Sequence, residues 1–297
     1  MFSYRHVFHA GNHADVLKHI VLHQTLLHLR QKETPFFYID THAGAGAYAL
    51  DSGQARKSGE AKEGISKLLD AADLPQVVLD YLELVRAVNP GGRLSVYPGS
   101  PYIAELLLRG QDRLRLFEMH PADIQALEEN VRQWSGLKSI PRPERGKRII
   151  VSRKDGFSSL KSLLPPPARR AVVLIDPSYE VKHDYRQVVE TLSDALKRFP
   201  TGTYLVWYPV LQRIESRRFA RQLKKVCNRE WLHLTFRAAS PVPDGTGFVA
   251  SGMFIINPPW KLRAQLEEAL PALVKVLGRD EGAGFTVEAG TVAENRQ

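Results

Sequence analysis

The sequence has very little cysteine and no long apolar run, and both shortages narrow the class of protein. Cys227 is the single cysteine among 297 residues, so no disulfide can form within the chain. No stretch approaches the ~18 uninterrupted apolar residues of a transmembrane helix, and Met1–His6 lacks the apolar core of a signal peptide. We therefore expect a protein of the reducing cytoplasm that does not contact a membrane.

Acidic residues are also scarce relative to basic ones. The chain has 41 Lys and Arg against 32 Asp and Glu, which gives a net charge of +9 and a pI near 9.6. This excess favours a polyanionic partner, most simply a nucleic acid, although a basic protein without such a partner would have the same composition. The basic residues gather in two segments, Arg142, Arg145, Lys147 and Arg148, and Arg213, Arg217, Arg218, Arg221, Lys224 and Lys225. Spacing of four residues in the second segment predicts one helical face that contacts phosphates, because Glu215 is its only acid.

Short apolar segments alternate with helical patterns along most of the chain. Such alternation is typical of a doubly wound α/β sheet. The expected strands are 36–40, 114–118, 148–152, 171–175, 204–208, 232–237 and 253–257. The short hop from 237 to 253 suits a final hairpin, so the pattern predicts a seven-stranded, mostly parallel sheet whose last strand is antiparallel.

One interval in this alternation is too long for a simple crossover. Between Gly46 and the strand at 114–118 lie far more residues than a ~10–15-residue crossover helix needs. Ser100-Pro101 is predicted to begin that helix, with Ser100 as its N-cap. We interpret 48–98 as a small helical insert, with helices at 60–71 and 74–88, in a main domain of residues 1–47 and 99–297. A substrate platform and a decorative insertion are both open for it. The last ~18 residues are weakly patterned, and we expect them to be partly disordered.

Polar segments follow the first three strands of the predicted sheet. The glycine-rich turn at 42–46 lets the backbone approach a ligand, Glu118 can accept bonds from two ribose hydroxyls, and Asp155 can face an adenine amino group. With Ala49 the turn also fits the dinucleotide fingerprint G-x-G-x-x-A. No helical pattern begins directly after it, as a pyrophosphate site needs. This edge therefore suits an adenosine-bearing cofactor without phosphate, although a structural turn, an exposed strand-end acid and an ordinary Asp-Gly turn are the alternative interpretations of the three segments.

The tetrad Asp176-Pro177-Ser178-Tyr179 follows a segment, 171–175, with the pattern of a buried central strand. At that position the carboxylate can accept N–H bonds from an amino-bearing base, proline can direct neighbouring carbonyls, and the ring can stack on the base. The tetrad resembles the D/N-P-P-Y/F/W signature of methyltransferases that modify exocyclic amino groups, with Ser178 in place of the second proline. Asn257-Pro258-Pro259-Trp260 matches those letters better, but it follows the last strand and precedes the predicted helix 262–277. We therefore assign catalysis to Asp176, Pro177 and Tyr179.

The first thirty residues are rich in histidine. His9/His13 and His19/His23 have the i, i+4 spacing of helical metal ligands, but neither an H-E-x-x-H motif nor a cysteine pair accompanies them, so we expect no metal. Tyr4, His6 and Lys18 suit contact with RNA better, because they combine an aromatic ring with polar groups. Simple solvation of the segment is the alternative.

Together these segments resemble the RlmJ family of bacterial large-subunit ribosomal RNA adenine-N6 methyltransferases. The residues that carry the resemblance are 4–6, 9–19, 40–44, 117–118, 154–156 and 175–180. The resemblance implies a class I (Rossmann-like) methyltransferase with a helical insert, whose sheet also has seven strands. It implies an S-adenosylmethionine site at His19, His42, Ser100, Glu118, Asp155, Gly156 and Asp176. It further implies that residues 1–19, and Tyr4 above all, contact the RNA. Ser178 departs from the family and affects only the rigidity of the loop, because the φ of serine is not fixed.

The resulting hypothesis is methyl transfer to N6 of an adenine in 23S ribosomal RNA by a monomer. Asp176 and a main-chain carbonyl near Pro177 would hold both N6 hydrogens, while Tyr179 would stack on a splayed-out base. Positioning would supply most of the rate, because a sulfonium is already a strong electrophile. The alternatives are an N6-adenine methyltransferase for DNA or another RNA, a nicotinamide-dependent oxidoreductase, and an RNA-binding protein with a vestigial site.

Overall fold

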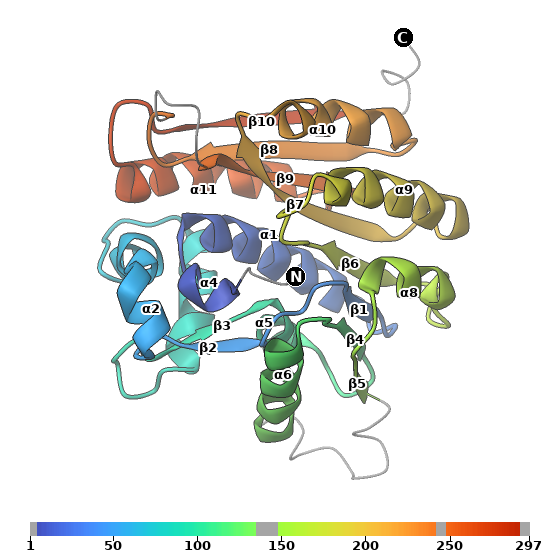
Figure 1. Cartoon of the computed structure of the whole chain (residues 1–297), viewed down its shortest axis with the longest axis horizontal. Helices are drawn as coiled ribbons and strands as arrows, with labels where there is room; N and C mark the ends of the chain where they lie inside the picture. Colours follow the sequence, from blue (N-terminus) through green and yellow to red (C-terminus); the bar gives the residue numbers. More distant parts are fainter. Residues whose placement is uncertain (1–4, 135–147, 242–247, 292–297) are drawn as a thin grey trace.

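The computed structural model describes residues 5–134, 148–241 and 248–291. Within them, eight strands form one sheet in the order β10-β8-β9-β7-β6-β1-β4-β5 (Figure 1). The strands are β1 (Phe37–Asp40), β4 (Arg113–Phe117), β5 (Ile149–Ser152), β6 (Ala171–Ile175), β7 (Thr203–Leu211), β8 (Trp231–Arg237), β9 (Phe248–Ile256) and β10 (Gly284–Gly290). Strands β5, β4, β1, β6 and β7 are parallel, whereas β9 is antiparallel to both β7 and β8. The predicted α/β class and the hairpin formed by β8 and β9 are confirmed.

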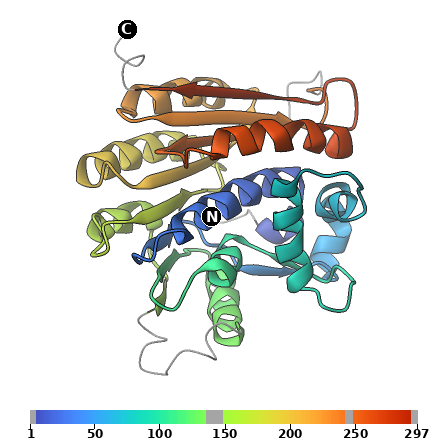
Figure 2. The same cartoon turned by 180° about the vertical axis from the view of Figure 1, so that it is seen from behind.

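Helices cover both faces of the sheet, as Figures 1 and 2 show from opposite sides. One face carries α1 (His13–Arg30), α5 (Ser100–Leu107) and α11 (Leu262–Leu277), and the other carries α8 (Gly156–Leu163), α9 (His183–Arg198) and α10 (Ile214–Val226). The helix α6 (Pro121–Gln133) contacts β5, and the short 3₁₀ turn η1 (His6–Phe8) precedes α1. This double cover explains why all five residues of β6 are buried and apolar. None of the helices in the described ranges is long and apolar enough to span a bilayer.

The sheet has one strand more than predicted. Strand β10 pairs antiparallel with β8 along its whole length, from Gly284 opposite Arg237 to Gly290 opposite Trp231. Residues 284–290 of the last ~18, which were expected to be partly disordered, thus form a regular strand. Most side chains of β10 are exposed, so backbone pairing and not apolar packing holds this edge strand. Its sequence therefore has no apolar periodicity that would predict a strand.

Residues 48–98 contain the predicted helices and a short ribbon that was not predicted. The helical segments are α2 (Gly53–Ser58), the single π turn η2 (Lys62–Ser66), α3 (Lys67–Leu69) and α4 (Gln76–Ala87). Strands β2 (Ala47–Ala49) and β3 (Val96–Pro98) pair antiparallel at the base of this segment. Val78 and Tyr81 of α4 pack in the same apolar core as α1 and α11, so the segment has no separate core. Its boundaries as an insert stay a prediction.

Candidate functional site

A cavity of about 690 Å³ lies at the carboxyl ends of β1, β4 and β6, next to the start of α1. Cavities of ~300–1,000 Å³ are typical of small-molecule sites, and this one lies where strand order reverses on either side of β1. The predicted site residues that line it are His6, Lys18, His19, His42, Ser100, Glu118, Asp155, Gly156, Asp176, Pro177 and Tyr179. Tyr4 lies outside the described residues. The topology thus brings together residues from distant parts of the chain.

The glycine turn after β1 contacts the acid at the end of β4. Gly44 has a φ of +59°, which favours glycine, and its amide donates to Glu118 Oε2 at 2.8 Å. The other oxygen, Oε1, accepts from the amide of His120 at 2.7 Å. Burial raises the pKa of Glu118 above its usual value, against the effect of these backbone donors. Each carboxylate oxygen has a second lone pair, so Glu118 can still accept bonds from ligand hydroxyls.

Ser100 and Asp40 form a buried polar contact that the sequence did not predict. Asp40 is fully buried, and its Oδ2 accepts bonds from the hydroxyls of Tyr38 at 2.6 Å and Ser100 at 2.7 Å. Burial raises the pKa of Asp40 to about 6 despite these two donors. The expectation that Ser100 caps α5 is wrong: Gly99 is the N-cap, and the Ser100 hydroxyl bonds Asp40 instead. Ser100 therefore ties the start of α5 to the end of β1.

Asp155 and Gly156 form the start of α8, against the end of β1. Asp155 is the N-cap, and its Oδ1 accepts from the amide of Phe157 at 3.0 Å. A Cβ atom at position 156 would overlap the backbone carbonyl of Thr41, so only glycine permits this approach. His42 packs edge-on against Phe157, and burial lowers its pKa to about 4, which leaves the ring neutral at pH 7.

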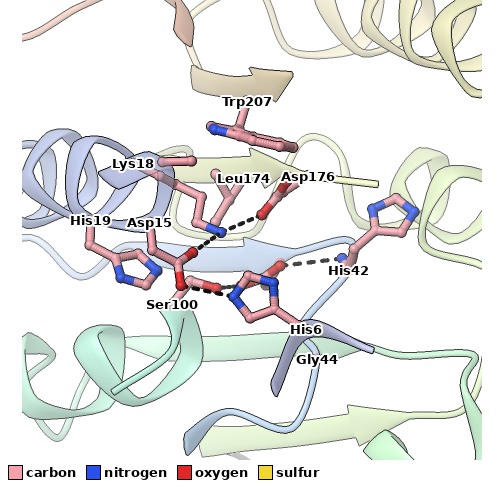
Figure 3. Close-up of polar contacts among 12 residues, drawn as sticks. His6, Asp15, Lys18, His19, His42, Gly44, Ser100, Leu174, Asp176 and Trp207 are labelled. Atoms are coloured by element: carbon pink, nitrogen blue, oxygen red, sulfur yellow. Dashed lines mark hydrogen bonds and ion pairs between the residues drawn. The ribbon is translucent and has the colours of Figure 1, made fainter. Parts of the chain in front are cut away.

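The acid of the catalytic tetrad belongs to a charged cluster with α1 (Figure 3). Lys18 Nζ lies 2.6 Å from Asp176 Oδ2 and 2.9 Å from Asp15 Oδ1, and His6 Nε2 donates to Asp15 Oδ2 at 2.9 Å. Asn12 caps the helix and Asp15 and Lys18 share one face, which aims both side chains at β6. Burial opposes the charged form of Lys18, but the two carboxylates raise its pKa well above the usual value. Lys18 was predicted to contact RNA; here it binds the two carboxylates, and its RNA role stays a prediction.

The aromatic residue of the tetrad is buried in the loop after β6. Tyr179 is 1% exposed with a φ of +53°, an uncommon conformation for a bulky residue. Its ring packs on Tyr185, and its hydroxyl donates to the carbonyl of Trp207 at 2.7 Å. Because the ring is buried among these contacts, base stacking by Tyr179 stays a prediction. The half-buried Trp207 does line the cavity, with Lys18 Nζ 5.7 Å from its ring centroid.

Trp207 is a site residue that sequence reasoning missed, because its segment carried only the signal of a strand. Arg213 was counted only as part of the basic segment. It lines the cavity as well, and it donates to the carbonyl of Tyr179 at 3.0 Å.

The competing N-P-P-W segment lies at the other edge of the sheet. Strand β9 is antiparallel to β7, so Asn257, which follows it, is at the amino ends of the parallel strands. Its amide donates to the carbonyls of Pro200 at 2.9 Å and Gly202 at 2.6 Å. With a φ of +51°, Asn257 forms a turn before α11, and it does not belong to the cavity lining.

The two basic segments have different environments. Arg148 is buried and paired with Glu105, so it is not part of an exposed basic surface, while Arg142, Arg145 and Lys147 lie outside the described residues. On α10, four basic side chains are exposed: Arg217, Arg218, Arg221 and Lys225. Within the described residues, no group of three or more His, Cys, Asp or Glu side chains is placed to hold a metal ion.

Comparison with known proteins gives matches over nearly the full length. A family model described as RsmJ, "Ribosomal RNA large subunit methyltransferase D, RlmJ", matches residues 33–289. Two curated proteins named Ribosomal RNA large subunit methyltransferase J are similar to the chain. The one from Haemophilus influenzae is 46% identical over 289 residues, covering 97% of this chain and 98% of the relative. The one from Escherichia coli K12 is 46% identical over 273 residues, covering 92% and 93%. A crystal structure of a Legionella pneumophila protein superposes with a TM-score of 0.82 at 35% identity, covering 95% and 98%.

Proposed function

Because the chain belongs to the RlmJ family of ribosomal RNA large subunit methyltransferases, we propose that it methylates N6 of one adenine in 23S ribosomal RNA, with S-adenosylmethionine as methyl donor. The observation that carries the proposal is the placement of Asp176. This acid lines one cavity together with the glycine turn and with Glu118 and Asp155, which suit an adenosine group. An acceptor for an amino group therefore lies in the same space as the groups for the donor.

The cavity residues fit S-adenosylmethionine better than a dinucleotide. Gly44 forms the turn that donates to Glu118, and Gly156 lets the start of α8 approach Thr41. Glu118 and Asp155 have acceptor capacity for the ribose hydroxyls and the adenine amino group. The turn leads into strand β2 and not into a helix, so no helix N-terminus follows it to hold a pyrophosphate. Glu118 and Asp155, which line the cavity, would also disfavour phosphates. This favours the methyltransferase over the nicotinamide-dependent oxidoreductase.

When bound, S-adenosylmethionine supplies an electrophilic methyl group; the chain supplies orientation. Lys18 donates to Asp176 Oδ2 and holds the carboxylate in place, which leaves Oδ1 to accept an N–H bond from the exocyclic amine. A main-chain carbonyl near Pro177 accepts the second hydrogen, so the nitrogen lone pair points in one direction. Asp176 need not take a proton first, because the nitrogen becomes far more acidic once it is methylated.

The target base would enter by leaving its stack in the RNA. Tyr179 is the aromatic of the tetrad, and stacking would require its ring to leave the contacts with Tyr185 and Phe219. His6 lines the cavity beside Asp15, and we propose that it contacts the RNA, as we propose for Tyr4, which lies outside the described residues. These assignments are part of the proposal.

The exposed basic face of α10 is the proposed docking surface for the RNA backbone. Arg217, Arg221 and Lys225 are four residues apart and exposed, and the acid of the helix, Glu215, pairs with Lys182 at 3.2 Å. Arg213 directly precedes the helix and lines the cavity. The basic face of α10 therefore begins next to the cavity. We further propose that the protein acts as a monomer in the cytoplasm, where ribosomal RNA is available.

Transfer of a tritiated methyl group to deproteinised 23S ribosomal RNA tests the proposal, with nucleosides identified by mass spectrometry after digestion. The expected product is N6-methyladenosine at a single position. Label in another nucleoside would refute the assigned atom. RNA binding without label, under conditions in which S-adenosylhomocysteine binds, would favour an RNA-binding protein with a vestigial site. Equal labelling of DNA would indicate that the substrate is another nucleic acid.

A further inference from the structure

A chain of three buried hydrogen-bonding side chains joins the segment 48–98 to the cavity. His19 Nδ1 lies 2.8 Å from the hydroxyl of Tyr97, on β3, and that hydroxyl lies 2.8 Å from the hydroxyl of Tyr81, on α4. Both tyrosines are 0% exposed and His19 is 1% exposed. The rings of His19 and Tyr97 are stacked, with centroids 5.5 Å apart. Through these contacts α4 and β3 connect to His19, which lines the cavity.

The direction of these hydrogen bonds follows from the need to satisfy buried donors. If Tyr81 donates to Tyr97 and Tyr97 donates to His19 Nδ1, both hydroxyl hydrogens are used. In the opposite direction, the hydrogen of Tyr81 has no acceptor among the described contacts. A buried donor without a partner costs about 1–3 kcal/mol, so the first direction is favoured.

This direction fixes the tautomer of His19. A neutral imidazole has one donor and one acceptor nitrogen, so an accepting Nδ1 puts the hydrogen on Nε2. Burial lowers the pKa of His19 to about 3, which keeps the ring neutral at pH 7. His19 lines the cavity, and within the described part of the chain Nε2 has no hydrogen-bond partner. The cavity therefore receives one N–H donor from this side chain.

The other polar side chains of the edge are mostly acceptors. Glu118 and Asp155, which line the cavity, suit the ribose hydroxyls and the adenine amino group of the donor, all of which donate. The carboxylate of its methionine part only accepts, and it requires a donor such as Nε2–H. Resting on the proposed use of S-adenosylmethionine, we propose that Tyr81 and Tyr97 are positioning residues that orient His19 so that Nε2–H binds this carboxylate. The segment 48–98 is then part of the cofactor site.

Two ligands that differ only in the carboxylate test this proposal. S-adenosylhomocysteine has it, and decarboxylated S-adenosylhomocysteine keeps the amine but lacks it. By calorimetry the wild-type chain should prefer the first by at least about tenfold, the scale of a hydrogen bond to a charged group. Tyr97→Phe should remove most of this preference, because it should lower the affinity for S-adenosylhomocysteine and not the affinity for the decarboxylated ligand. Tyr81→Phe should have the same effect to a smaller extent.

Tyr204→Phe is the matched control, because its buried hydroxyl donates to the carbonyls of Ala195 and Phe199. These residues belong to a different apolar core from the one that contains Tyr81 and Tyr97. It should leave the preference unchanged. Equal weakening of both ligands by Tyr97→Phe would overturn the positioning role and leave the proposed function intact. A wild-type chain that binds neither ligand would instead refute the proposed cofactor.

The tautomer can also be measured without any variant that affects folding. Nitrogen-15 NMR of the histidine-labelled wild-type chain, with His19→Gln used only for assignment, should show His19 protonated on Nε2. Protonation on Nδ1 would overturn the proposal. In Tyr97→Phe the spectrum should change to a mixture of the two tautomers.

Discussion

Lys18→Met tests the charged cluster that holds Asp176. Lys18 pairs with Asp15 and Asp176, and the side chains of the three residues are only 6%, 2% and 13% exposed. Methionine fills a similar volume but leaves two carboxylates without their cation. Removing one partner of a buried ion pair costs ~3–5 kcal/mol, because the remaining charge stays buried and uncompensated. Urea unfolding near neutral pH should show a stability loss of this size.

The pH dependence of this loss follows from Asp15. Burial favours its neutral form, but His6 and Lys18 hold the pKa of Asp15 well below the usual value. In the wild type its stabilising contribution is complete above the unfolded pKa of about 3.9 and is lost as the pH falls through the folded pKa. In Lys18→Met that pKa rises, so ionised Asp15 destabilises the chain at neutral pH and protonation relieves it. The difference between the two chains should therefore shrink from about pH 7.5 to about pH 4.5.

Lys67→Met is the matched control for this measurement. Lys67 pairs with Glu63 at 2.7 Å, but the side chains are 38% and 58% exposed, and such surface pairs contribute only about 0–1 kcal/mol. A loss for Lys18→Met no larger than this control, or a difference that grows on acidification, would refute the reasoning.

Three further experiments test the N-P-P-W segment, the start of α8 and the basic face of α10. Asn257→Ala should lose about 1–3 kcal/mol of stability, because two side-chain hydrogen bonds are removed, and it should retain methyl transfer. A folded but inactive variant would indicate that the Asn257 segment is catalytic. Gly156→Ala should sharply lower the affinity for S-adenosylhomocysteine measured by calorimetry, because the added Cβ overlaps Thr41. Gly53→Ala is the control and should leave this affinity unchanged, because the space around Gly53 is open. Similar affinities of the two variants would contradict the packing argument. Arg217→Glu with Arg221→Glu should weaken RNA binding and reduce its salt slope by about 1.5 without changing affinity for S-adenosylhomocysteine; an unchanged slope would exclude α10 as a phosphate surface.

The parts of the fold that were predicted correctly are those with a strong local pattern. The continuous apolar segment 171–175 is buried on both sides as β6, and the amphipathic segment 262–277 is α11 with the same bounds. The excess length before β4 indicated the extra helices. Strands β2 and β3 have three residues each and β10 is mostly exposed, so none of them carries an apolar periodicity that a sequence pattern could detect.

The site was predictable as an edge of the sheet but not as a set of contacts. A topological rule placed Gly44, Glu118, Asp155 and Asp176 together, because parallel strands end on one side. The bond from Lys18 to Asp176 joins residues 158 positions apart, and only the packing of α1 on the sheet brings them together. Ser100 has the local pattern of a helix cap, but a buried acid offers its hydroxyl a better partner. Tertiary contacts such as these override local preference.

We propose that Asp176 orients the amine, a role separate from its predicted place in the S-adenosylmethionine site. Asp176→Asn keeps the shape of the side chain but replaces one acceptor oxygen with an N–H donor. Single-turnover methyl transfer and calorimetry with S-adenosylhomocysteine, made on the same preparation, test the claim most directly. We predict that methyl transfer falls by at least about 100-fold while S-adenosylhomocysteine affinity changes by less than about threefold. Near-normal methyl transfer by this variant would contradict the account.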